Sequence, residues 1–185
     1  MKKVLTRKTK ENDGFGMLLR ADCYAQGHRM IDEKVLQEST LDTLNHIAKV
    51  EGYLSLCSDL LRGRAARHDA SKLQEPERSG YAGLTQALKG LHYGTPEHRA
   101  AFVPFKTIIA HHYEHNSHHP EHYDNGVDGM SLLDVIEMLC DWKAASERTG
   151  DEFATSIHLC VERFRIGKQL ATILVNTATE LGWMK

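Results

Sequence analysis

The sequence predicts an all-α protein, a single-domain helical bundle, on three observations. Apolar residues from Leu41 to Leu61 recur at steps of three and four, which is the spacing of an amphipathic helix. Start signals for further helices follow, and no segment shows the alternation of a half-buried strand. The 185 residues are 41% hydrophobic and 26% charged, which allows one sizeable core. We therefore expect helices packed on helices.

The first helix is expected to begin at Ser39 and to end near Gly63. Residues 1–38 would form an N-terminal arm and lead-in segment, which is polar and lysine-rich at its start. Residues 39–185 would form the all-α domain.

Proline and cap residues predict the next elements. Pro76 bars a regular helix interior, and a short helix is expected around residues 84–91. Thr95 before Pro96 is typical of an N-cap followed by proline at the first helical position. The helix that starts there should run into a histidine cluster at residues 110–123.

Further breaks are expected in and after that helix. Pro104 should kink it and Asn116 should end it. The later boundaries are expected at a capping pair, a single cap and a glycine, namely Ser131 with Asp134, Asp151, and Gly167.

Charge and composition narrow the location and the partners. A formal net charge of −2 argues against a large nucleic-acid surface, so any nucleotide partner would be small. No apolar run reaches the roughly 18 residues of a membrane span, and the start lacks the apolar region of a signal peptide. Four dispersed cysteines without a CxxC pair predict reduced thiols, so we expect a cytoplasmic protein. Trp183 and the stretch LATILV suit a homodimer interface or a core equally.

Histidine is concentrated in one segment, because six of the twelve histidines lie between His111 and His122. The pair His68–Asp69 precedes this cluster, and imidazole and carboxylate are ligands that Zn, Mn, Co and Fe accept. The alternative is a loop that uses its histidines as hydrogen-bonding groups or as a pH-sensitive surface. Beside the His–Asp pair, the cluster favours a metal–phosphate pocket lined by two or three of the six.

Asp141 is an unusual residue for its position, because it lies between Cys140 and Trp142 on an apolar helix. A buried carboxylate is costly unless it is paired or binds a metal. Asp134 and Glu137 share its stripe on that helix, so the alternative is a solvated acidic face.

The ordered set of His46, His68–Asp69 and Asp141 resembles the HD-domain phosphohydrolase superfamily. In HDASK, Lys72 stands where many members have the lysine of an HD-x-x-K motif, and AHHYEH resembles the paired histidines of binuclear members. The runs HDASKLQEPE, HNSHHPEHY and EMLCDWKAA are also similar to a family of short, largely uncharacterised phage and bacterial proteins, over roughly residues 40–185.

This resemblance implies an HD-like fold and a phosphohydrolase that uses one or two divalent ions, Mn, Co, Zn, Mg or Fe. It implies a set of metal ligands drawn from both segments, namely His46, His68, Asp69, His111, His112 and Asp141. Lys72 would neutralise charge on the phosphate, and His115 or His119 would protonate the leaving oxygen. His118 is a looser candidate of the same cluster.

His46 is close to His68 in sequence, so it reaches the site only if its helix ends early, near Gly52, or the chain returns extended. Otherwise a clustered histidine would complete the shell. Glu75 and Glu77 are either loop charges or groups that hold the histidines in orientation.

The resemblance implies a small phosphorylated substrate, first of all a (deoxy)nucleotide, attacked by a metal-activated water. Two alternatives stay open. One is a di-iron oxygenase of the HD fold, for which Glu137 would supply an extra carboxylate. The other is a non-catalytic, metal-stabilised binding protein.

Overall fold

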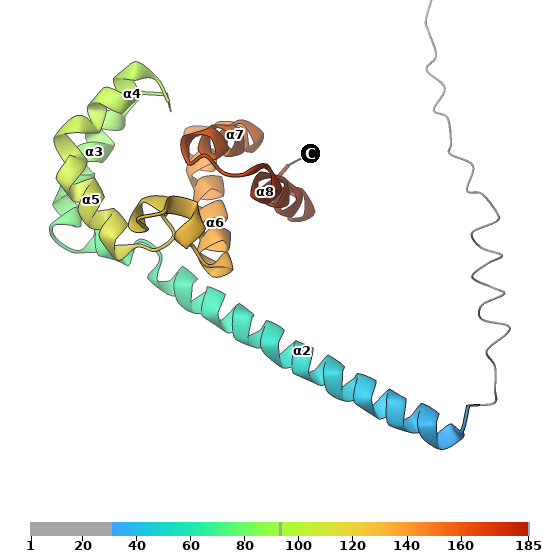
Figure 1. Cartoon of the computed structure of the whole chain (residues 1–185). Coiled ribbons are helices and arrows are strands. Elements are labelled where there is room, and N and C mark those ends of the chain that lie inside the picture. The colour runs from blue at the N-terminus through green and yellow to red at the C-terminus, as the bar shows by residue number, and fades with distance from the viewer. Residues whose placement is uncertain (1–30, 93, 185) are drawn as a thin grey trace, which may run out of the picture. The chain divides into compact units, whose positions relative to one another are not determined.

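The computed structural model describes residues 31–92 and 94–184 (Figure 1). Residues 1–30 of the predicted N-terminal arm and lead-in segment, Cys23 among them, lie outside the described residues. The chain divides into two units, residues 1–53 and residues 54–185. Helix α2 (Glu33–Arg67) supplies nearly all the described residues of the first unit and the start of the second.

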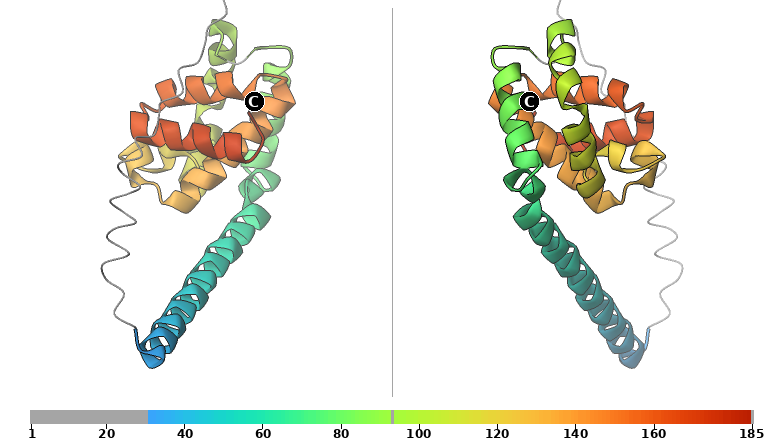
Figure 2. Two further views of the ribbon diagram at one scale, coloured as in Figure 1. Left: turned by 90° about the vertical axis from the view of Figure 1, so that its right-hand side faces the viewer. Right: turned by 90° about the vertical axis from the view of Figure 1, so that its left-hand side faces the viewer.

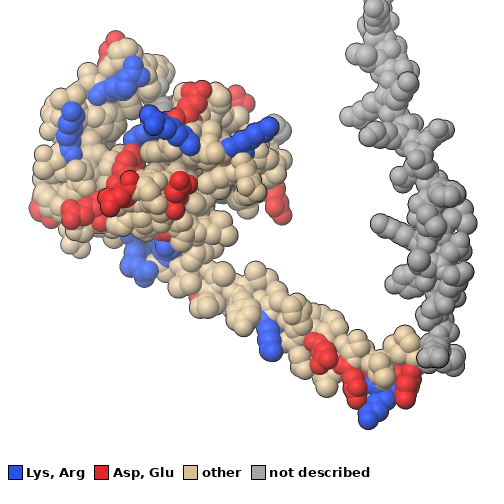
Figure 3. Space-filling view, in the orientation of Figure 1, with Lys and Arg blue, Asp and Glu red and all other residues tan. Residues whose placement is uncertain are grey.

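Within residues 31–92 and 94–184, the second unit holds all the other helices, several of them single 3₁₀ turns. In chain order they are η1 (Ala70–Leu73), α3 (Glu77–Leu88), α4 (Pro96–Ala101), η2 (Val103–Phe105), α5 (Lys106–His115), η3 (Pro120–His122), η4 (Gly126–Gly129), α6 (Leu132–Thr149), α7 (Phe153–Arg163) and α8 (Lys168–Glu180). The described residues contain no strand, so the all-α class is confirmed. None of the described helices has the length and apolar character of a membrane span. Figure 3 shows side chains of Lys and Arg and of Asp and Glu interspersed over one face of the second unit.

Several predicted boundaries are confirmed. The Thr95 side chain accepts a hydrogen bond from the backbone N–H of His98, with proline at the start of α4. Ser131 and Asp134 form a capping box at the start of α6. Helix α5 ends before Asn116, and Gly167 separates α7 from α8.

Other boundaries were wrong, each for a local reason. Helix α2 begins at Glu33 and passes through Gly63, since one glycine in a long helix costs only about 1 kcal/mol. Helix α3 begins directly after Pro76, which takes the N-cap position. Pro104 interrupts the helix instead of kinking it, because it lies in the 3₁₀ turn between α4 and α5. Asp151 accepts a hydrogen bond from Thr149, and Glu152 takes the N-cap position of α7.

The apolar core lies in the last three helices, where α7 packs on α6 and α8 packs on α7 (Figure 2). Its most deeply buried side chains come from all three helices, namely Met138, Leu139, Ile157, Leu174 and Ala178. Trp183 packs against this core with its ring centroid 6.0 Å from that of Phe153. Within the stretch LATILV, Leu174 is buried in this core, while Ile173 stays exposed.

A second packing contact joins α3 to α5. At Gly80 an added Cβ would lie 2.7 Å from side-chain carbons of Ile108, and at Gly83 it would lie 2.9 Å from the ring of Phe105. The two helices approach this closely only because both α3 positions lack a side chain. Helices α3, α5 and α6, with the loop after α5, carry the polar residues described next.

Candidate metal centre

The His–Asp pair lies where helix α2 has just ended. Asp69 follows His68 and adopts the left-handed conformation with φ 56° and ψ 15°. On a regular helix, consecutive side chains diverge by about 100°. The left-handed conformation of Asp69 instead turns the backbone away from the direction of α2. As a result, Nε2 of His68 lies 3.7 Å from Oδ2 of Asp69 and 3.7 Å from Oδ1 of Asp141.

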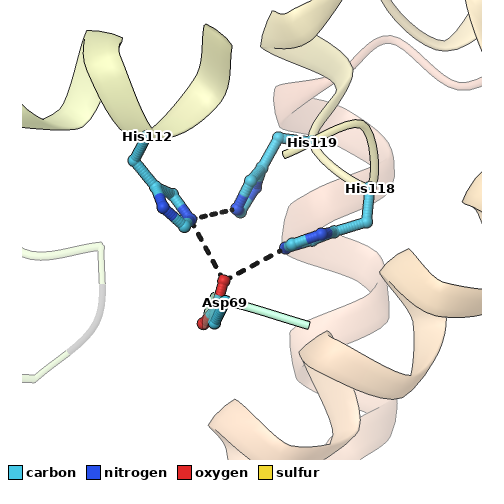
Figure 4. Close-up of side chains that lie close together, drawn as sticks. All are labelled: Asp69, His112, His118 and His119. Carbon is cyan, nitrogen blue, oxygen red and sulfur yellow. Dashed lines mark hydrogen bonds and ion pairs between the residues drawn. The ribbon is translucent and has the colours of Figure 1, made fainter. Parts of the chain in front are cut away.

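Three histidine side chains surround the Asp69 carboxylate (Figure 4). Nε2 of His112, from α5, lies 3.2 Å from Oδ1 of Asp69. Nε2 of His118, from the loop after α5, lies 3.6 Å from the same oxygen. Nε2 of His119 lies 2.9 Å from Nε2 of His112. One potential ligand atom of each of the four residues lies within 4.8 Å of the others.

Two atoms at the centre of this group lack a hydrogen-bond partner although they are buried. They are Oδ1 of Asp69 and Nε2 of His118. A buried polar atom left unpaired costs about 1–3 kcal/mol, so such atoms are uncommon in folded proteins. Here both face the same point, which is the arrangement expected of ligands to one cation.

Glu77, at the start of α3, holds His112 from the far side of its ring. Its carboxylate is completely buried and accepts hydrogen bonds of 2.8 Å from Nδ1 of His112, Nδ1 of His111 and the Ser71 hydroxyl. Burial opposes ionisation of Glu77, but the donors from His111, Ser71 and His112 outweigh it and lower its pKa. An ionised carboxylate only accepts, so Nδ1 of His112 donates to Glu77 and Nε2 is the nitrogen that faces Asp69. Of the two alternatives for Glu75 and Glu77, Glu77 contacts the histidines, whereas Glu75 is exposed and accepts from Ser79.

Glu137, on α6, performs the same task for two other rings. Its Oε1 lies 2.9 Å from Nδ1 of His68 and 3.3 Å from Nδ1 of His118. Its Oε2 accepts a 2.9 Å hydrogen bond from Arg64, which also pairs with Asp134 at 2.7 Å. The stripe of acids on α6 is therefore not a solvated face, because Asp134 and Glu137 are both largely buried in ion pairs.

The surroundings set opposite charge states for the imidazoles. The interaction of His68 with Asp141, more than that with Glu137, overcomes burial and raises the pKa of His68 to about 9. Burial, with the neighbouring rings of His118 and His112, lowers the pKa of His119 to about 3. Burial likewise lowers the pKa of His118. His118 and His119 are therefore neutral at pH 7 and offer lone pairs.

The carboxylates of the site are ionised. Burial opposes the charge on Asp69, but the nearby His112 ring and Lys72 outweigh it, so the pKa of Asp69 lies below its ordinary value. Lys72 donates to Oδ2 of Asp69 at 2.6 Å and lies over the Tyr81 ring, 4.7 Å from its centroid. His68, likewise, outweighs the burial of Asp141 and lowers its pKa.

A separate group lies on the outer side of Glu77, and two predicted site residues belong to it. His111 and His115 are one turn apart on α5, with ring centroids 4.2 Å apart. Together with Glu77 they form a second set of potential ligand atoms within 4.8 Å of one another. The structure therefore does not place His111 or His115 in the groups that contain Asp69.

His46, which was also predicted as a metal ligand, lies on α2 in the unit of residues 1–53. Its helix continues to Arg67 and does not end near Gly52. Among the described residues, the groups of potential metal ligands form without it. Its role as a ligand stays a prediction, and the clustered histidines supply the alternative shell that we expected in that case.

Arg64, Asn116 and Tyr81 were not predicted to act at the site, and Glu137 was predicted there only as an extra carboxylate of the di-iron alternative. Glu137 contacts two ligand rings and accepts from Arg64, and Asn116 donates to the Ser71 hydroxyl and to the carbonyl of His112. Tyr81 contacts Lys72. The adjacent pair HH before Pro120 was a usable signal for His118, whereas nothing local distinguishes Arg64 from other helix arginines.

The side chains of this site lie in a part of the chain that matches one known family. Residues 36–180 match the model of a family described as "Family of unknown function (DUF5662)". The chain belongs to the DUF5662 family. The residues matched to DUF5662, 36–180, include every side chain of the candidate metal centre. No curated protein and no solved structure matches the chain.

Proposed function

We propose that this protein is a divalent-metal-dependent phosphohydrolase that acts on a small phosphorylated metabolite, first of all a (deoxy)nucleotide. The observation that carries the proposal is the pair of buried, unpartnered atoms at the centre of the histidine cluster, Oδ1 of Asp69 and Nε2 of His118. Asp69 belongs to the His–Asp pair on which the resemblance to HD-domain phosphohydrolases rests, and His118 belongs to the run HNSHHPEHY, which is similar to the family of short phage and bacterial proteins.

The residues present fit a divalent cation. Neutral imidazoles with carboxylates are a donor set for Zn, Mn, Co or Fe, and suit Mg less well. Two carboxylates accept from Nδ1 of three rings, which leaves Nε2 as the ligand atom of each. The residues that would hold the cation are Asp69, His112, His118 and His119, with His68 and Asp141 as a second set that shares Asp69.

The charge of the site also supports dependence on a metal. Four carboxylates, those of Asp69, Glu77, Glu137 and Asp141, lie around the histidines. Arg64 and Lys72 offset them only in part. An anionic phosphate ester is repelled by such a site unless a cation adds positive charge.

When bound, a divalent cation lowers the pKa of a coordinated water and offsets charge on a phosphoryl oxygen. The protein's own residues would divide the remaining tasks. Lys72 can leave Asp69 to bind a phosphate oxygen, and the Tyr81 ring keeps its ammonium at the site. His119, held neutral by burial, would serve as a ligand to the cation and not as the proton donor. Glu77 and Glu137 keep the ligand rings in one orientation.

The test compares the wild-type protein with Asp69→Asn. Chelator-treated protein is reloaded with Mn, Co, Zn, Mg or Fe, its bound metal is determined by elemental analysis, and phosphate release is measured on a panel of nucleotides and sugar phosphates. We expect bound metal and metal-dependent turnover, with both reduced at least about 100-fold in Asp69→Asn. Asp151→Asn, at an exposed carboxylate that belongs to none of the groups of potential metal ligands among the described residues, serves as the matched control.

Other results would overturn the proposal in distinct ways. Stoichiometric iron without phosphate release would support the di-iron oxygenase. Bound metal without turnover on any phosphate ester would support the non-catalytic binding protein. Absence of bound metal under every condition would remove the metal centre itself.

A further inference from the structure

We propose a second, outer divalent-cation site formed by His111 and His115 of α5, with Glu77 behind it. This site is separate from the groups that contain Asp69, and its existence does not depend on the proposed hydrolase activity. The kind of ligand is a borderline transition-metal ion such as Zn²⁺, Cu²⁺ or Ni²⁺.

The rings of His111 and His115 both donate a hydrogen bond through Nδ1. Nδ1 of His115 lies 2.8 Å from the backbone carbonyl of His111, and a carbonyl only accepts. Nδ1 of His111 lies 2.8 Å from Oε1 of Glu77, a carboxylate oxygen that accepts the hydrogen bond. Both Nδ1 atoms therefore carry the proton. Nε2 of each ring is therefore the nitrogen left to bind a metal.

The geometry of the His111–His115 pair also suits one shared ion. The two residues are four apart on α5, so their side chains lie on one face of the helix. The rings are stacked, with centroids 4.2 Å apart and planes inclined by 20°. One potential ligand atom each of His111, His115 and Glu77 lies within 4.8 Å of the others. His115 is exposed and His111 is about one-third exposed, so an ion can reach them from solvent.

The buried carboxylate of Glu77 also supports the outer site. Imidazoles that bind metals usually donate their other N–H to a carboxylate or a carbonyl, and here each ring has one of these acceptors. Glu77 is fully buried and cannot serve as a mere surface charge. One of its oxygens faces His111 and the other faces His112, so the outer site and the inner histidine cluster share it.

The experiment measures how many Zn²⁺ ions the full-length, chelator-treated protein binds, by equilibrium dialysis followed by elemental analysis. We compare the wild type with His115→Gln, which removes one ligand at the surface. The matched control is His158→Gln, because His158 is also exposed on a helix and pairs with Glu162 four residues on. A melting curve in chelator confirms that each variant is folded.

We expect His115→Gln to bind one Zn²⁺ fewer than the wild type, or to bind that ion about 10–100-fold more weakly, while His158→Gln matches the wild type. In the Asp69→Asn background, one ion that depends on His115 should remain, and Cu²⁺ bound there should show an electron paramagnetic resonance spectrum with two nitrogen ligands. Equal numbers of ions and equal affinities in the wild type and His115→Gln would overturn the outer site. That result would leave the inner centre and the hydrolase proposal untouched, since those depend on Asp69.

Discussion

Glu137 is the residue that holds two ligand rings at once. Oε1 faces Nδ1 of both His68 and His118, while Arg64 neutralises Oε2. Because the two rings lie on different segments, Glu137 links the end of α2 to the loop after α5. The ring centroids of His68 and His118 are 4.4 Å apart, so a small rotation of either ring would separate their Nε2 atoms from Asp69.

The substitution Glu137→Gln is expected to weaken metal binding about 10–100-fold, because the neutral amide orients the rings poorly and leaves Arg64 underpaired. The measurement is Zn²⁺ affinity by competition with a chromophoric chelator. Glu147→Gln is the control, since Glu147 lies on the same helix but is exposed and pairs only with Lys143. Equal affinities in the two variants would show that Glu137 has no orienting role.

At the scale of elements, the contact between α3 and α5 sets the position of Glu77 against the histidines. Gly80 is one turn after Glu77, and its bare backbone lies against Ile108, which is one turn before His112. On both helices, the close contact is therefore one turn away from the residues that Glu77 joins by hydrogen bonds. Stability and metal affinity should depend on it together.

We expect Gly80→Ala to destabilise the protein by about 1–3 kcal/mol, because the new methyl group would meet Ile108 within 3 Å. Zn²⁺ affinity should fall as well. Gly52→Ala is the contrasting variant, since no atom lies within 4 Å of its added Cβ, and it should raise the helix propensity of α2 by about 1 kcal/mol. Urea unfolding and Zn²⁺ titration of both variants provide the measurement. A neutral or stabilising Gly80→Ala would contradict the tight contact.

The whole molecule should respond to pH in a way that its histidines determine. The pKa of His68 is raised to about 9, so its stabilising contribution is complete below about 6.5 and is lost as the pH rises to about 9. The pKa of His119 is lowered to about 3, so its contribution is complete above about 6.5 and is lost as the pH falls. The lowered pKa values of Asp69, Asp134 and Asp141 add to the loss below about 4.

The free energy of unfolding of the metal-free protein is therefore expected to peak near pH 6.5. Each histidine adds a slope of no more than about 1.4 kcal/mol per pH unit on its own side of the peak. Urea unfolding in chelator, at intervals between about pH 5 and pH 9, measures this curve. A steady rise through the whole range would show that His68 is not stabilised in its protonated form.

Local chemistry explains which features of the molecule were predictable from sequence. The all-α class follows from periodicity, and the caps at Thr95 and Ser131 follow from side chains that bond to nearby backbone. His68, Asp69 and Asp141 were predicted to meet, and they do. The partners of the histidine rings were harder, because Glu137 lies 69 residues from His68 in the chain. The division of the cluster between two sides of Glu77 depends on how α3 packs on α5, which no local pattern encodes.

The left-handed turn at Asp69 limits what can replace this residue. Asparagine and glycine adopt that backbone readily, whereas other residues lose about 1–2 kcal/mol there. Alanine at this position would therefore confuse a loss of folding with a loss of metal, and asparagine separates the two. The same reasoning applies to relatives in the DUF5662 family. A member with asparagine or glycine at this position would keep the turn yet lack the central carboxylate, and we expect it to fold without retaining the cation.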